Sequence, residues 1–142
     1  MKFVVDTREK DPWDLGVECV HKKLDSGDYS ILTLEDRVAI ERKTLDDLVQ
    51  SVIHERSRFF DELKRLTTYK YAYVVVEGSL RDLLVGNYRS HAHPNSVLGS
   101  TISMIADYGI PVFMCSDRQA ASKFSHDLLT YIGRKEEVHS HV

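Results

Sequence analysis

Two acids and a lysine in the first third of the 142-residue chain have the chemistry of a hydrolytic centre. Asp28 is followed after 12 residues by Glu41, and Lys43 stands two positions further on. Carboxylate oxygens are the ligands that Mg²⁺ and Mn²⁺ prefer, and a neighbouring lysine can orient or deprotonate an attacking water. The group therefore fits metal-assisted phosphodiester hydrolysis. Because acids and lysines are common, the spacing alone fits a solvated strand end equally well.

Two predicted strands would bring these side chains together. Residues 29–34 form an apolar-rich run, and residues 37–42 form a returning strand after a short acidic turn. An antiparallel hairpin of this kind places Asp28 near the end of the strand that carries Glu41. The period of a strand projects Glu41 and Lys43 from the same face. We therefore expect the two acids and the lysine to converge at this hairpin.

Three ordered motifs in this part of the chain resemble those of a known nuclease family. Residues 41–47, ERKTLDD, resemble the ERKxxxD signature of the XPF/Hef-type structure-specific endonucleases. Residues 5–9, VDTRE, and residues 27–28, GD, match the two upstream motifs of that family in the same order. Similar stretches continue as far as residues 107–112, DYGIPV, so the resemblance covers nearly the whole chain.

The resemblance implies a role for each charged side chain of these motifs. Asp28 and Glu41 would bind Mg²⁺ or Mn²⁺, and Asp6 would complete or support the ligand shell of the metal. Lys43 would position the attacking water. The resemblance thus gives four catalytic residues, of which the three acids are the metal ligands: Asp6, Asp28, Glu41 and Lys43.

Other charged residues beside the motifs are predicted to support the site. By resemblance, Arg8 contacts the scissile phosphate or holds a carboxylate in place, whereas the residues alone also fit an exposed Arg8–Glu9 ion pair. In a regular strand Arg42 lies on the face opposite its two neighbours, which indicates a structural task. Asp47 can close a capping box with Thr44 or orient a neighbouring basic side chain.

One further arginine of the family stands at the junction before the second predicted helix. Here both Arg56 and Arg58 lie at that junction, across what looks like a short insertion, and we assign the position to Arg56. The alternative for both is the solvated start of a helix. Glu77, at the end of an apolar strand, either supports the site or caps the next turn. The supporting and phosphate-binding residues are then Arg8, Glu9, Arg42, Asp47 and Arg56.

The order of the predicted elements indicates an α/β fold with a mixed central sheet flanked by helices. A strand-rich first part is followed by helices that alternate with strands at residues 71–77 and 110–115. Such an order suits the restriction-endonuclease-like fold, which the resemblance also implies. We expect one XPF/Hef-type nuclease domain over residues 1–133, with a final helix that stops at Gly133, and a flexible polar tail over residues 134–142.

Composition is that of an ordinary globular protein, with 42% hydrophobic and 29% charged residues. The chain has no apolar run of about eighteen residues and no signal peptide, so we expect an intracellular protein without a membrane anchor. The formal net charge of −3 argues against a strong sequence-independent grip on DNA. Because several acids are assigned to a metal site, the rest of the surface is expected to be mildly basic.

Taken together, the residues and the resemblance predict a metal-dependent DNA endonuclease that cuts near junctions of duplex and single strand, such as flaps or forks, in DNA repair, recombination or replication. One alternative is a catalytically silent DNA-binding or scaffolding subunit, against which the intact acids and Lys43 argue. Another is a nuclease acting on RNA or non-branched DNA, because such a site contacts phosphates rather than base edges.

The predicted domain is small for a protein that must grip branched DNA. The family usually pairs two nuclease-type domains and adds helix-hairpin-helix modules, and this chain has no room for such a module before Val142. We therefore expect a homodimer or a partner protein. The predicted helix that begins at Pro94 and the final helix carry apolar stripes and are the candidates for that interface.

Overall fold

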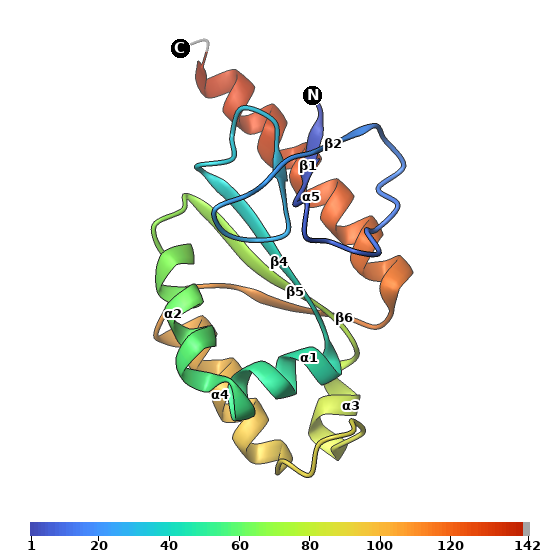
Figure 1. Cartoon of the computed structure of the whole chain (residues 1–142), viewed down its shortest axis with the longest axis vertical. Coiled ribbons are helices and arrows are strands. Elements are labelled where there is room, and N and C mark those ends of the chain that lie inside the picture. The colour runs from blue at the N-terminus through green and yellow to red at the C-terminus, as the bar shows by residue number, and fades with distance from the viewer. Residues whose placement is uncertain (141–142) are drawn as a thin grey trace.

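The computed structural model describes residues 1–140, which form a six-stranded sheet between two layers of helices (Figure 1). The strands are β1 (Phe3–Val5), β2 (Cys19–His21), β3 (Tyr29–Ile31), β4 (Val38–Thr44), β5 (Tyr71–Glu77) and β6 (Val112–Cys115). Their order in the sheet is β2-β1-β3-β4-β5-β6. Because β3 runs antiparallel to both of its neighbours while the other pairs are parallel, the sheet is mixed, as expected.

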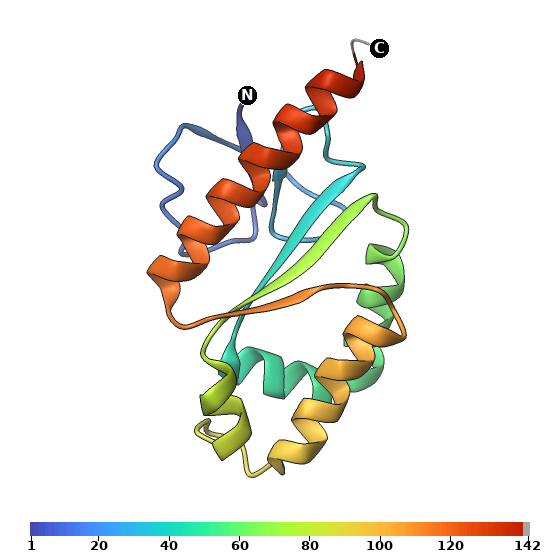
Figure 2. The same cartoon turned by 180° about the vertical axis from the view of Figure 1, so that it is seen from behind.

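The helices divide between the two faces of the sheet. One face is covered by α1 (Leu45–Val49), η1 (Gln50–His54), α2 (Arg56–Leu66), α3 (Leu80–Val85) and α4 (Pro94–Ala106). The other face is covered by the long α5 (Arg118–Ser140), which crosses the sheet in Figure 2. None of the helices in residues 1–140 has the length and apolar character needed to cross a membrane.

Alternation along β4 divides the buried side chains into two cores. Ala39 packs with the apolar residues of the α1–α4 layer, whereas Val38 and Ile40 pack with those of α5. All three are fully buried. The polar half of the strand continues the same alternation, so Glu41 lies on the face of Ala39, as the period of two predicts.

The predicted hairpin forms, but its first strand is shorter than expected. β3 stops at Ile31, and the chain then turns through Thr33, which has a φ of 76°. Leu34 closes this turn, because its carbonyl oxygen accepts hydrogen bonds from the backbone of Arg37 and Val38 at 2.9 and 3.0 Å. A turn built on backbone hydrogen bonds, rather than a two-residue loop, therefore leads into β4.

The junction expected to hold an insertion is a π-helix. In η1 the amide of Glu55 donates to the carbonyl of Gln50 at 3.0 Å, a five-residue step in place of the usual four. The chain breaks from helical geometry at Glu55, which has φ −122° and ψ 32°, and α2 begins at the next residue. The π-helix therefore lies in the segment that joins α1 to α2.

The final helix does not stop at Gly133, where the sequence predicted its end. α5 continues to the last described residue, and only the final two residues of the predicted tail lie outside the described part. A Cβ at position 133 would lie 2.4 Å from the Met1 Sδ, so a larger residue there would require the flexible Met1 side chain to move. Beyond Gly133, the buried Glu136 forms ion pairs with Arg37 and Lys70 at 3.3 and 2.8 Å. These contacts hold the last turns against the sheet.

Candidate active site

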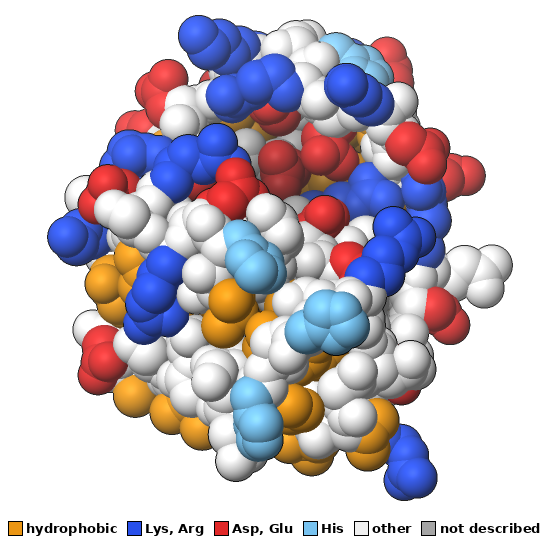
Figure 3. Space-filling model, turned by 60° about the horizontal axis from the view of Figure 1, so that its bottom comes forward, with side chains coloured by type: hydrophobic (Ala, Val, Ile, Leu, Met, Phe, Trp, Pro, Cys, Tyr) orange, Lys and Arg blue, Asp and Glu red, His pale blue; other side chains and the backbone are white. Residues whose placement is uncertain are grey.

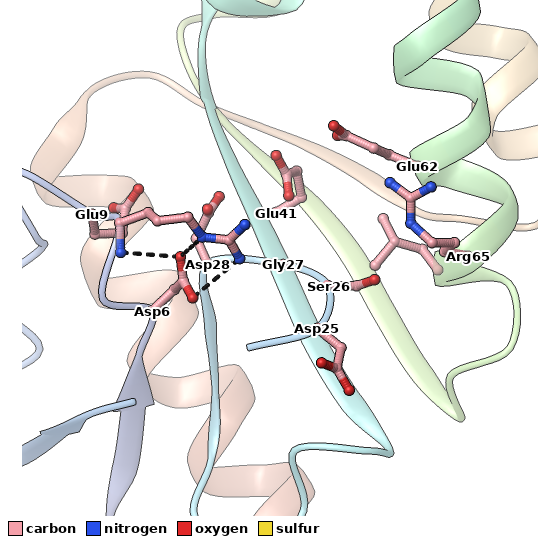
Figure 4. A pocket seen from close by; sticks show the side chains of 11 residues that line it. Asp6, Glu9, Asp25, Ser26, Gly27, Asp28, Glu41, Glu62 and Arg65 are labelled. Carbon is pink, nitrogen blue, oxygen red and sulfur yellow. Dashed lines mark hydrogen bonds and ion pairs between the residues drawn. The ribbon is translucent and has the colours of Figure 1, made fainter. Parts of the chain in front are cut away.

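A pocket of about 240 Å³ lies between the hairpin and α2 (Figure 4). Acidic side chains, red in Figure 3, gather in a hollow that has basic side chains on both sides. The pocket is lined by the loop after β1, the turn before β3, the middle of β4 and one face of α2. The acids that line it are Asp6, Glu9, Asp25, Asp28, Glu41 and Glu62.

Backbone pairing carries Asp28 to the middle of β4 rather than to its end. The Asp28 amide donates to the carbonyl of Ile40 at 2.8 Å, and the Arg42 amide donates to Asp28 Oδ2 at 2.8 Å. Gly27 makes this approach possible, because it has a φ of 80° and a Cβ there would lie 3.0 Å from the Ala39 Cβ. The acid of the GD motif is thus held beside the acid of the ERK motif.

Asp28 and Glu41 are electrostatically short of positive charge. Burial raises the pKa of Glu41 to about 8, and the charge of Asp28 adds to that effect. Burial likewise raises the pKa of Asp28 to about 6, against a lowering contribution from the hydrogen bond with the Arg42 amide. Two partly buried carboxylates that oppose each other's ionisation are the environment in which a cation is bound most favourably.

The donor set fits a divalent cation that keeps part of its water. Asp28 and Glu41 supply hard oxygen ligands at the pocket. Within residues 1–140, no group of three or more His, Cys, Asp or Glu side chains is arranged to enclose a metal by itself. Mg²⁺ typically binds through one or two carboxylates with water and substrate phosphate completing the octahedron, and this pair suits that mode.

Lys43 follows Glu41 on the same face of β4, as predicted. Its Nζ lies 3.6 Å from Glu41 Oε2 and 5.1 Å from the centre of the Phe59 ring, and only 16% of its side chain is exposed. The aromatic ring and the neighbouring carboxylate therefore hold the ammonium group next to the candidate metal ligands.

Asp6 is buried, and its carboxylate oxygens already have partners. It accepts hydrogen bonds from Arg8 Nε at 2.7 Å and from the Leu24 amide at 2.8 Å. Burial opposes its ionisation, but the hydrogen bonds from Arg8 and Leu24 outweigh burial and lower the pKa of Asp6. Asp6 therefore supports the pocket by holding Arg8, whose side chain remains 65% exposed.

Arg42 points to the opposite face of β4, where it joins two acids. Its Nε donates to Glu77 Oε1 at 2.9 Å and its Nη1 donates to Glu9 Oε2 at 3.1 Å. The guanidinium carbon lies 4.9 Å from the centre of the Trp13 ring. The three charged side chains are all less than one-fifth exposed. This placement agrees with the structural task expected for Arg42 and gives Glu77 a supporting role.

Trp13 anchors the loop that carries Arg8 and Glu9. Its ring stacks on Tyr29 with centroids 4.6 Å apart, and its indole N–H donates to Glu77. The Trp13 amide donates to the Tyr29 hydroxyl at 2.8 Å, and that hydroxyl donates to Glu9 at 2.9 Å. The loop is thereby joined to β3, β4 and β5 through one network of side chains.

Asp47 lies outside the pocket and caps α1. Its side chain accepts from the Thr44 amide at 3.2 Å, and the Thr44 hydroxyl accepts from the Asp47 amide at 3.1 Å. This is the capping box, one of the two explanations that the sequence allowed. Asp47 thus contributes by fixing the direction of the helix that follows the ERK strand.

Neither arginine of the helix junction lines the pocket. Arg56 donates to the Ser100 hydroxyl at 2.6 Å, and its guanidinium carbon lies 4.4 Å from the centre of the Phe60 ring, so it joins α2 to α4. Arg58 pairs with Glu55 and has a side chain that is 73% exposed. The structure therefore does not bring Arg56 together with the other predicted site residues.

Three charged residues that line the pocket were not singled out from the sequence. Asp25 lies in the turn before β3, and Glu62 and Arg65 project from α2. The helical period contains a signal for the last two, since each precedes a buried leucine, Leu63 or Leu66, and so stands at the edge of the buried face. The helical period does not predict which edge of the buried face of α2 lies next to the acids, because that depends on how α2 packs against the sheet.

We expect the metal-free protein to lose stability as the pH rises from about 5 to about 8. The folded-state pKa values of Asp28 and Glu41, about 6 and about 8, lie above their ordinary values of 3.8 and 4.5. The folded state therefore binds more protons than the unfolded state in this window, and removing them costs stability. Urea unfolding in EDTA across this range measures the effect. Glu41→Gln should flatten the upper part of the curve, and stability that rises with pH would contradict the expectation.

Glu77→Gln should destabilise the fold by about 1–3 kcal/mol, because it removes the charged acceptor shared by Arg42 and Trp13. Urea unfolding gives the free energy, and the emission of Trp13, the sole tryptophan, reports on the network directly. Glu18→Gln is the matched control, since that side chain is 80% exposed. Equal unfolding free energies and unchanged emission in both variants would refute the role of Glu77.

Comparisons with known proteins identify the family. Residues 5–128 match the ERCC4 domain. The chain is 35% identical over 143 residues to a putative ATP-dependent RNA helicase of Methanocaldococcus jannaschii, covering 97% of this chain and 16% of that protein. It is 35% identical over 107 residues to the 3'-flap repair endonuclease Xpf of Saccharolobus solfataricus, covering 75% and 42%. The chain spans less than half the length of either relative.

Solved structures share the fold described above. XPF from Aeropyrum pernix matches with a TM-score of 0.74 and 26% identity, over 92% of this chain and 61% of that one. XPF from the same organism in complex with DNA matches with a TM-score of 0.71 and 27% identity, over 95% and 66%. The predicted resemblance and the mixed-sheet, restriction-endonuclease-like fold are confirmed. The chain therefore belongs to the ERCC4 domain family and has the fold of the XPF-type nuclease domain.

Proposed function

We propose that this domain is a Mg²⁺- or Mn²⁺-dependent DNA endonuclease. The observation that carries the proposal is the pair of partly buried carboxylates, Asp28 and Glu41, with the Lys43 ammonium 3.6 Å from the second. A scaffolding domain gains nothing from two buried acids that resist ionisation. In a hydrolase, the two acids provide a cation site beside a lysine that can orient or deprotonate the attacking water.

Five charged residues in or beside the pocket have a task in this proposal. Asp28 and Glu41 hold the cation, which when bound polarises the phosphate and lowers the pKa of water. Lys43 orients the attacking water and stabilises its deprotonated form through its positive charge. Arg8, held by Asp6 but still 65% exposed, offers its guanidinium to the scissile phosphate. These residues position charge around one phosphodiester and make no demand on base identity.

Branched DNA is the proposed substrate. Support comes from one relative, a 3'-flap repair endonuclease, and from the similar XPF structure that was solved with DNA. Recognition is proposed to depend on the geometry of the DNA and not on its base sequence, because a hydrolytic site of this kind contacts phosphates rather than base edges. RNA and unbranched DNA are the alternatives that the cleavage test must separate.

We expect cleavage of end-labelled flap or fork DNA near the branch point, with Mg²⁺ or Mn²⁺ and not in EDTA. Asp28→Asn and Lys43→Ala should each lower the rate by about 10²-fold or more, because each removes a group that contacts the metal or the water. Asp36→Asn and Lys23→Ala are the matched controls, since both residues are exposed and lie outside the pocket.

The same experiment distinguishes the rival functions. Preferred cutting of RNA, single strands or plain duplex would reject the branched-DNA proposal while keeping the hydrolytic one. Tight binding of branched DNA without cutting under either metal would favour the silent scaffolding subunit. Equal loss of activity in Asp36→Asn and Asp28→Asn would remove the special role of Asp28.

We also propose that a second copy or a related partner covers the edge of the sheet at β6. This edge strand pairs only with β5 among the described strands, and its four residues are incompletely buried. Exposed apolar side chains stand on the helices at either side of it: Ile102 and Ile105 on α4, 53% and 46% exposed, and Tyr131 on α5, 70% exposed. The two helices are those whose apolar stripes suggested an interface from the sequence.

Analytical ultracentrifugation at tens of micromolar tests this interface. We expect a dimer for the native chain and a monomer of unchanged melting temperature for a variant with Ile102→Glu and Ile105→Glu, because a charge at an apolar interface must be desolvated. Val85→Glu is the control, since this exposed apolar residue lies on α3. A native chain that remains monomeric rules out the homodimer, and then only a different partner chain remains for the edge.

A further inference from the structure

The α2 wall of the pocket carries an arginine that has no partner in the protein. Arg65 lines the pocket together with Glu62 and is exposed. Among residues 1–140, no hydrogen bond, ion pair or ring contact involves its side chain. Figure 4 shows it projecting from α2 beside Glu62, on the side of the helix that faces Glu41. A guanidinium left free at an acidic pocket is available for a ligand.

Arg8, the other pocket-lining arginine, differs from Arg65 in this respect. Arg8 is committed to Asp6 by two hydrogen bonds and also donates to the Leu24 carbonyl at 2.8 Å. Arg8 is hydrogen-bonded to Asp6, which follows β1, whereas Arg65 stands on α2. Figure 4 shows Asp28 and Glu41 between Asp6 and Arg65. A nucleic-acid strand that places one phosphate at the metal ligands passes between these two walls.

The negatively charged phosphates of such a strand are suitable ligands for the Arg65 guanidinium. Successive phosphates carry one negative charge each, and the planar guanidinium fork binds phosphate oxygens in a bidentate manner. Glu62, one helical turn earlier, lines the same wall without pairing to Arg65 in the described part of the chain. It repels phosphate and adds to the unfavourable charge at Glu41, so Arg65 is the group on this wall that attracts the backbone.

We propose that Arg65 binds a phosphate of the substrate strand next to the scissile one, from the wall opposite Arg8. The inference rests on the proposed nuclease function and adds to it a substrate contact on α2 that fixes the path of the strand across the pocket. Because the contact is made in the ground state and away from the reacting atoms, its loss weakens binding more than it slows the chemical step.

The salt dependence of DNA binding tests the proposal. Binding of the full chain to labelled flap DNA is measured by fluorescence anisotropy in EDTA at several salt concentrations. Arg65→Ala should reduce the slope of log K against log salt by about 0.7–0.9, the value for one phosphate contact. Arg65→Lys should keep most of the slope, since it keeps the charge. Arg81→Ala is the control, because that arginine is exposed and likewise free of partners but lies on α3.

The outcomes separate this inference from the proposed function. A slope reduced in Arg65→Ala but not in Arg81→Ala, with a raised KM and a nearly unchanged kcat in cleavage, supports the contact. Equal slopes in the two variants overturn it while leaving the nuclease proposal intact. If the native chain shows no salt-dependent binding to any DNA, the contact is overturned, while the metal-dependent cleavage assay decides the nuclease proposal separately.

Discussion

The site depends on one constraint: the backbone on both sides of Glu41 is hydrogen-bonded to Asp28. The carbonyl before Glu41 accepts from the Asp28 amide, and the amide after it donates to the Asp28 carboxylate. The pairing of the strands thereby holds the two acids together. The repulsion between their side chains is too weak to break this pairing. The sheet thus stores an electrostatic cost, visible in the raised pKa values of both groups, that a bound cation would relieve.

The charged side chains on the opposite face of β4 are paired. Glu41 and Lys43 lie on one face of β4. Arg42, the residue between them, lies on the other face and donates hydrogen bonds to both Glu9 and Glu77. The alternation of a strand therefore separates a reactive face, with charges left short of partners, from a supporting face, where the charges are paired and hydrogen-bonded. One run of three residues serves both tasks.

Local pattern predicted those parts of the molecule that depend on local geometry. The period of two placed Glu41 with Lys43 and set Arg42 apart, and the capping box at Thr44 formed as expected. The resemblance identified the family. What the pattern could not give was the packing between distant segments. Whether Arg56 or Arg65 faces the acids depends on how α2 rotates against the sheet, and the end of α5 depends on contacts of Glu136 with residues far away in the sequence.

The π-helix η1 affects the direction in which the chain enters α2. Each residue of an α-helix turns the chain by about 100°, so removing one residue from η1 would restore the ordinary helical step and change the direction in which the chain leaves at Glu55. If α2 turned with the chain, Glu62 and Arg65 would leave the pocket together. An insertion or deletion in η1 can therefore change several α2 residues of the pocket at once, although η1 itself lies outside the pocket.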